Sequence, residues 1–207
     1  MTKLELITKA QLYLDDTSDL STTEWSDLFD KMYRKVNSDR PWEGTKKEGA
    51  GTMSTTVPYV ALASDFLFLT QNYNSTDSSE LAVRPVVFVG TAYEPYDVVS
   101  WSDRRSYRDQ SGYAYIDWTN MRLVFTKQPA SAEAVEFDYH GQNTALTDGQ
   151  SPWFPAEYHD LLVHMMVADD FVIQQSDKAK SYRPENERMA KEYMEDMAWW
   201  NSQLIQI

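Results

Sequence analysis

The sequence has no cysteine, little glycine and no long apolar segment. Its 207 residues include 7 glycines and no cysteine, which excludes a disulfide framework, a cysteine-ligated zinc and a thiol nucleophile. No stretch approaches the roughly 18–20 apolar residues that cross a bilayer, and no apolar segment of a secretion signal follows Met1. We therefore expect the protein to stay in the soluble phase of a reducing compartment.

Basic residues are also scarce. The chain has 19 Lys and Arg against 32 Asp and Glu, a formal net charge of −13. Proteins grip nucleic acid through Lys and Arg that replace counterions on the phosphates, and anionic membranes also attract basic segments. The charge therefore argues against both as bound partners. The composition is typical of a globular chain, and the length fits one domain, with or without a large insertion.

The first 43 residues favour helices near 3–14 and 22–38. Ser21 and Glu24 have the spacing of a capping box, in which each side chain accepts from the other residue's backbone N–H. Apolar residues then recur at helical spacing: Trp25, Leu28, Phe29, Met32, Tyr33 and Val36. Asp39 and Arg40 before Pro41 end the pattern, because the residue before proline avoids the helical region.

Residues 44–80 show the weakest periodicity. Glycines and lysines near the start of this segment predict a mobile loop, with a flexible turn over 49–52 rather than a phosphate-binding loop. A short strand is expected over 66–69 and a polar loop over 72–79.

Residues 81–140 change to the alternation of two that is typical of strands. The expected strands are 86–89, 113–118, 121–125 and 134–139, with a turn at Thr119 and Asn120. They predict an antiparallel unit of four to six strands. Between strands lies a basic and aromatic loop that either contacts a partner or is simply solvated, with Arg104, Arg105, Tyr107 and Arg108 as its candidate contact residues.

The last 53 residues return to helical spacing. Pro155 suits the start of a helix, since its missing N–H costs nothing there, and apolar residues from Tyr158 to Val172 predict an amphipathic helix. Pro184 either kinks a long helix or begins a new one. The apolar C-terminal segment either packs on its own helices or reaches a neighbouring protein through Trp199, Trp200, Leu204, Ile205 and Ile207.

The sequence offers no recognisable catalytic constellation. His159 and His164 are about 140° apart around a helix, too far apart to share a metal as histidines four residues apart do. Asp160 and His164 share a face, a spacing more typical of a surface pair than of a site. We expect no catalytic residue, no metal site and no cofactor, although an enzyme with an unrecognisable constellation stays an alternative.

The order of elements predicts an α+β fold. The N- and C-terminal helices, residues 1–43 and 155–207, are expected to form one helical bundle. Residues 44–154 are expected to be a loop and an antiparallel β unit inserted into that bundle.

Three stretches then carry a resemblance to a known family. They are MRLVFTKQP at 121–129, FDYH at 137–140 followed by Leu146, and FPAEYHDLL at 154–162. A strand ending at proline leads to a strand ending in tyrosine, and a linker with a leucine precedes a proline-started helix with an aromatic-His-x-x-Leu pattern. This order resembles the head-to-tail adaptors of tailed bacteriophages, also called connector or head-completion proteins. The N-terminal helix pair fits as well.

The resemblance implies a structural protein of the virion neck. It implies a ring, usually of twelve copies, beneath the portal protein, which extends the DNA channel and docks the tail or the next neck protein. DNA would pass through without specific binding, as an acidic wall favours. The protein would be made in the bacterial cytoplasm. Two alternatives stay open: a tail-completion or terminator ring protein, and a non-viral β-domain binding module.

Overall fold

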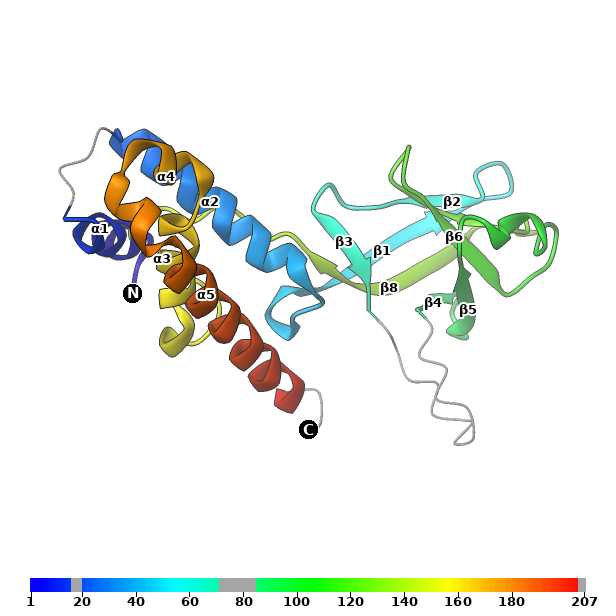
Figure 1. Ribbon diagram of the computed structural model, residues 1–207. Helices are drawn as coiled ribbons and strands as arrows, with labels where there is room; N and C mark the ends of the chain where they lie inside the picture. The colour runs from blue at the N-terminus through cyan, green and yellow to red at the C-terminus, as the bar shows by residue number, and fades with distance from the viewer. Residues whose placement is uncertain (16–19, 71–84, 205–207) are drawn as a thin grey trace. The chain divides into compact units, whose positions relative to one another are not determined.

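The computed structural model describes residues 1–15, 20–70 and 85–204 (Figure 1). The chain divides into two compact units. Met1–Gly44 and Asn143–Ile207 form one, which we call the helical unit, and Thr45–Gln142 forms the other, the β unit. No helix among the described residues is long and apolar enough to cross a membrane.

Two capped helices begin the helical unit. They are α1 (Lys3–Tyr13) and α2 (Thr22–Asp39), close to the predicted ranges. Ser21 and Glu24 form the predicted capping box, and their hydrogen bonds lower the pKa of the Glu24 carboxyl. Thr2 and Glu5 form a second box at α1, so both helices begin with their free N–H groups satisfied.

The C-terminal half of the unit contains one short 3-10 turn and three helices. These are η3 (Ala156–Tyr158), α3 (Asp160–Val167), α4 (Asp170–Gln175) and α5 (Asp177–Leu204). The single helix predicted from Tyr158 to Val172 is wrong, because Asp169 leaves the helical region and its side chain accepts from the N–H of Phe171, capping α4. Pro184 lies inside α5, so it does not begin a new helix.

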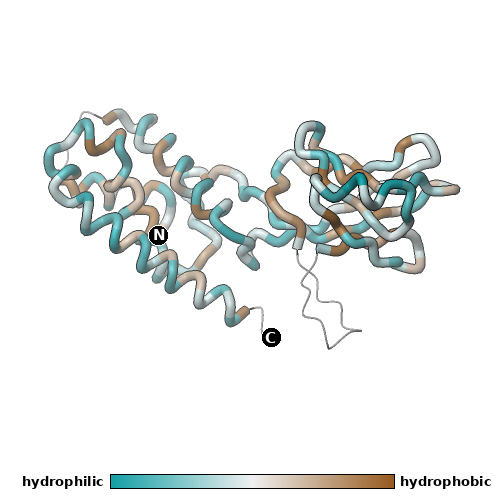
Figure 2. Tube along the Cα trace, turned by 45° about the vertical axis from the view of Figure 1, so that its right-hand side comes forward, coloured by the Kyte–Doolittle hydropathy of each residue, from teal (hydrophilic) through white to brown (hydrophobic). Residues whose placement is uncertain are grey.

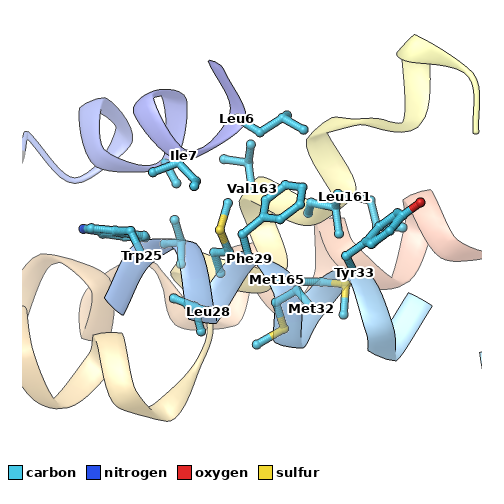
Figure 3. Close-up of a cluster of buried hydrophobic side chains, with 14 of the residues drawn as sticks. Leu6, Ile7, Trp25, Leu28, Phe29, Met32, Tyr33, Leu161, Val163 and Met165 are labelled. Carbon is cyan, nitrogen blue, oxygen red and sulfur yellow. The ribbon is translucent and has the colours of Figure 1, made fainter. Parts of the chain in front are cut away.

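One apolar core joins these helices. Helix α3 contributes side chains all round its axis, among them Leu161, Leu162 and Met166, and therefore lies at the centre. Figure 3 shows side chains of α1, α2 and α3 meeting in this cluster. Trp42 follows α2 and is fully buried, and its indole N–H donates to the carbonyl of Val36 at 2.7 Å.

His159 is a buried polar member of this core. Its Nε2 lies 2.9 Å from the carbonyl oxygen of Phe154, and its Nδ1 lies 2.9 Å from the backbone nitrogen of Met1. These partners assign the proton to Nε2, which donates, while Nδ1 accepts. Burial lowers the pKa of His159, which favours the neutral ring at neutral pH.

The described residues of the β unit form eight strands. After the short turn η1 (Glu43–Thr45) they are β1 (Lys46–Met53), β2 (Tyr59–Ala61), β3 (Phe66–Leu69), β4 (Val86–Val89), β5 (Glu94–Val99), β6 (Tyr113–Asp117), β7 (Arg122–Phe125) and β8 (Glu133–Gly141). A second short turn, η2 (Asp103–Arg105), lies between β5 and β6. The strand order is β1-β8-β4-β5-β6-β7-β2, with β3 also paired to β8.

The sheet is mixed and nearly barrel-shaped. Strands β5 and β6 pair in parallel, and the other pairs are antiparallel. Strands β1 and β2, at the two ends of the order, contact each other. A Cβ on Gly51 would lie 2.2 Å from Cγ1 of Val60, so glycine lets the two ends of the sheet approach. The enclosed core includes Val87, Ala114, Leu123 and Val135, all fully buried.

The predicted fold class, a helical bundle with an inserted antiparallel β unit, is therefore wrong. The sheet is mixed, has eight strands and covers about half the chain, and most of the helical residues follow it. The mobile loop and turn expected near 44–52 are strand β1, in which Gly49 packs under the ring of Phe137. Strand β5 also escaped prediction, because it contains Pro95. The polar loop expected at 72–79 lies outside the described residues.

We expect Gly51→Ala to destabilise the β unit by about 1–3 kcal/mol, because the new methyl group meets Val60. Val60→Ala in the same chain removes the obstructing methyl groups, so the double variant should lose less stability than the two single variants added together. Thermal unfolding followed by circular dichroism measures both. Gly149→Ala is the matched control, since nothing lies within 4 Å of its Cβ position. Additive losses at 51 and 60 would contradict the close contact.

His159 should make the stability depend on pH. Its pKa is lowered by folding, so the unfolded chain takes up a proton more readily. Its stabilising contribution is full above about pH 6.5 and declines as the pH falls toward the lowered native pKa. We expect the melting temperature to fall between about pH 7.5 and about pH 5.5, and to fall less for His159→Gln. If the melting temperatures of the two proteins fall by the same amount across that pH range, His159 does not have this role.

Candidate interaction surfaces

The three histidines lie in different packing environments. His164 donates from Nδ1 to Oδ1 of Asn186 at 2.7 Å, because the amide of Asn186 itself donates to the carbonyl of Tyr182. The ring of His164 is thus engaged by Asn186 rather than by Asp160, the carboxylate on the same helix face. Asp160 pairs instead with Lys9, with 2.7 Å between Oδ1 and Nζ. His140 is buried in the β unit beside the hydroxyl of Thr45, at 3.1 Å.

Metal-ligating side chains do not converge in the part of the chain that the structure describes. No group of three or more His, Asp or Glu there could hold a metal ion. The expectation that the protein has no catalytic residue and no cofactor stays a prediction.

The C-terminal end of α5 divides between packing and exposure. Trp200 packs on Tyr158, with the ring centroids 6.1 Å apart, and belongs to the edge of the helical core. Asn201 is buried, accepts from the backbone N–H of Glu43 at 2.9 Å and donates to the carbonyl of Pro41. Trp199 and Leu204 point outward, 67% and 41% exposed. The predicted residues Ile205 and Ile207 lie outside the described residues.

Helix α5 buries only a few of its described side chains completely. Its buried residues are Ala179, Asn186, Met197 and Asn201, and Figure 2 shows most of the helix as hydrophilic or neutral. The apolar pattern of the sequence does not reveal the two buried asparagines, because it reports apolar side chains only. They are buried because each amide finds hydrogen-bond partners.

The predicted basic loop forms an ordered cluster between β5 and β6. We call Arg104, Arg105 and Arg108 the arginine cluster. The Arg104 guanidinium lies 3.7 Å from the centre of the Trp101 ring and donates to the Trp101 carbonyl. Trp101 in turn packs edge-on against Tyr115, at 5.4 Å, and Tyr107 packs on Tyr113, at 4.3 Å between ring centres.

A hollow of about 220 Å³ lies at this cluster. It is lined by the three arginines together with Tyr115, Phe125 and Thr126. Among the described residues, Arg105 has no carboxylate partner, and Arg108 has only a 3.6 Å pair with Asp109 that is exposed on both sides. Exposed pairs of this kind contribute little, so the cluster is available to an anionic surface.

An acidic surface of the β unit was not predicted. It is a hollow of about 650 Å³ over β1, β8 and β4, and its lining includes Glu48, Glu136 and Asp138 with Phe88 and Tyr93. We call these five residues the acidic face. The alternation of Glu136 and Asp138 along one strand was visible in the sequence. Glu48 could join them only once residues 46–53 were assigned to a strand.

The helical unit also carries a groove between α2 and α5. Its volume is about 520 Å³, and methionines and alanines line it under a charged rim, among them Met32, Met165, Met194, Ala168 and Ala190. Methionine adapts to irregular partners.

Comparison with known proteins confirms the resemblance to the bacteriophage adaptors. The family model described as SU10 adaptor protein matches residues 1–206. No curated protein matches the chain. The match covers both the helical unit and the β unit, so it does not rest on a shared fragment. The chain therefore belongs to the SU10 adaptor protein family, a family of bacteriophage head-to-tail adaptors, and is a structural component of the virion neck.

Proposed function

We propose that this adaptor is one subunit of a ring, of twelve copies, that joins the portal protein to the tail or to the next neck protein and extends the DNA channel. The observation that carries the proposal is the family match over residues 1–206. A subunit in such a ring needs a contact to each neighbour and a contact to the portal, and the described surfaces supply candidates for both.

The C-terminal end of α5 is our candidate for the portal contact. Trp199 and Leu204 are large, apolar and exposed, and tryptophan is enriched among the residues that dominate binding energies. The buried amide of Asn201 and the ring of Trp200 fix this end of the helix on its own unit. The exposed side chains are therefore presented from a rigid element, which lowers the entropy lost on binding.

The negative charge suits a channel that DNA passes through. A formal charge of −13 repels phosphate and provides few cations to replace its counterions. We infer that DNA moves through the ring without specific binding. The arginine cluster then serves a protein contact rather than a phosphate contact, since it is a small basic area on an acidic chain.

The direct test mixes the purified protein with portal rings of the same phage and images the product by electron microscopy. We expect a ring of adaptor subunits on the portal. A stable hexamer formed without the portal would instead favour a terminator protein. A monomer with no affinity for the portal would favour a binding module of another kind.

Replacing Trp199 and Leu204 together by alanine should weaken portal binding by at least about tenfold, because two exposed apolar anchors are lost. Biolayer interferometry on immobilised portal rings measures the change. Leu12→Ala is the matched control, since Leu12 is also exposed in the helical unit but lies on α1. If the double variant binds as tightly as the control, the end of α5 is not the portal contact.

A further inference from the structure

The acidic face is built at a cost to the β unit itself. The strand register places Glu48 of β1 directly opposite Asp138 of β8, and like charges in that position repel each other. Glu136 lies two residues away on the same face, opposite Ala50 on one side and Phe88 on the other. Within the described residues none of the three carboxylates forms an ion pair or a side-chain hydrogen bond. A cationic partner would remove this repulsion.

Aromatic side chains add an apolar surface to the charged groups of the acidic face. Phe88 is half-buried on β4, and Tyr93, in the β4–β5 turn, is 57% exposed with a φ of 52°. A non-glycine residue with positive φ is uncommon and costs backbone energy. The face is therefore a hollow with an apolar rim on one side and carboxylates on the other, a combination that suits guanidinium groups, which pair with carboxylates and stack on rings.

The arginine cluster is the complementary surface of the same unit. It presents three guanidinium groups, and one of them is held over Trp101. It shares no residue with the acidic face and belongs to the β5–β6 connection rather than to β1, β8 or β4. Both surfaces are thus free to act at once in one molecule.

We propose that the acidic face of one copy receives the arginine cluster of the next copy. Three carboxylates and aromatic rings meet three arginines, and the two patches differ, so the contact is heterologous. Contacts of this type repeat around an axis and close into a ring when the rotation allows it. The inference rests on the proposed ring, and it names the surfaces that would join neighbouring subunits.

The absence of cysteine allows a direct test by crosslinking. Ala50 is an exposed residue that lines the hollow of the acidic face, opposite Glu136, and Ser106 is an exposed residue between Arg105 and Arg108 of the arginine cluster. A chain carrying both Ala50→Cys and Ser106→Cys, treated with a short bis-maleimide, should give a ladder of covalent oligomers. Each single variant should give no crosslinked dimer, because a head-to-tail contact does not bring two identical positions together.

The matched control moves the second cysteine from position 106 to position 119. Thr119 is exposed in the turn between β6 and β7, at the other end of β6 from the arginine loop. Ala50→Cys with Thr119→Cys should give no ladder. The reaction is run on the free protein at high concentration and on the portal-bound protein. Ring formation on the portal without a ladder overturns the inference and leaves the proposed function standing. If the free protein gives a ladder but does not bind the portal, the contact between copies stands and the proposed function fails.

Charge reversal provides a second test that does not depend on crosslinking geometry. Replacing Arg104, Arg105 and Arg108 by Glu should weaken self-association at least about 100-fold, and reversing Glu48, Glu136 and Asp138 to Lys should do the same. Carrying both sets of reversals in one chain restores complementarity and should restore rings, as counted in micrographs. The control reverses Lys127, Lys180 and Arg188, three exposed basic residues outside both patches. Equal loss in the control, or no rescue in the combined chain, would refute the contact.

Discussion

The β unit depends on the close approach of its first two strands at Gly51. Strand β1 lies at one end of the strand order and β2 at the other. They can approach each other because Gly51 of β1 has no Cβ to clash with Val60 of β2. The nearly closed sheet encloses its own apolar core, and its two end strands contact each other. The acidic face and the arginine cluster, which we propose as contacts with neighbouring subunits, are made of outward side chains of the β unit.

The helical unit relies on buried polar groups as well as on apolar packing. Asn186 and Asn201 tie α5 to His164 and to the segment after α2, and His159 ties its own turn to Phe154. Hydrogen bonds of this kind require one register between the helices, whereas apolar contacts tolerate several. The end of α5 can therefore expose Trp199 and Leu204 without losing its position.

Periodicity located the elements that follow simple rules. The stripe from Trp25 to Val36 is buried as expected, and the capping box at Ser21 begins α2. Strand β1 was not predicted, because glycines such as Gly49 and Gly51 are typical of loops. In the structure they allow close packing against Phe137 and Val60. The acidic face was missed with it, since Glu48 meets Asp138 only through long-range pairing. The arginine cluster was recognised in the sequence as a candidate contact loop. The stacking of Arg104 on Trp101 could not be inferred from the sequence.

The division of the chain has a consequence for folding on the ribosome. The helical unit is made of two segments separated by the whole β unit. At about 5–20 residues per second, the roughly 100 intervening residues take about 5–20 s to synthesise. During that time the apolar stripe of α2 has no α3 to cover it, whereas the β unit is contiguous and can fold as soon as it emerges. The nascent N-terminal helices are thus natural clients for chaperones until the last quarter of the chain arrives.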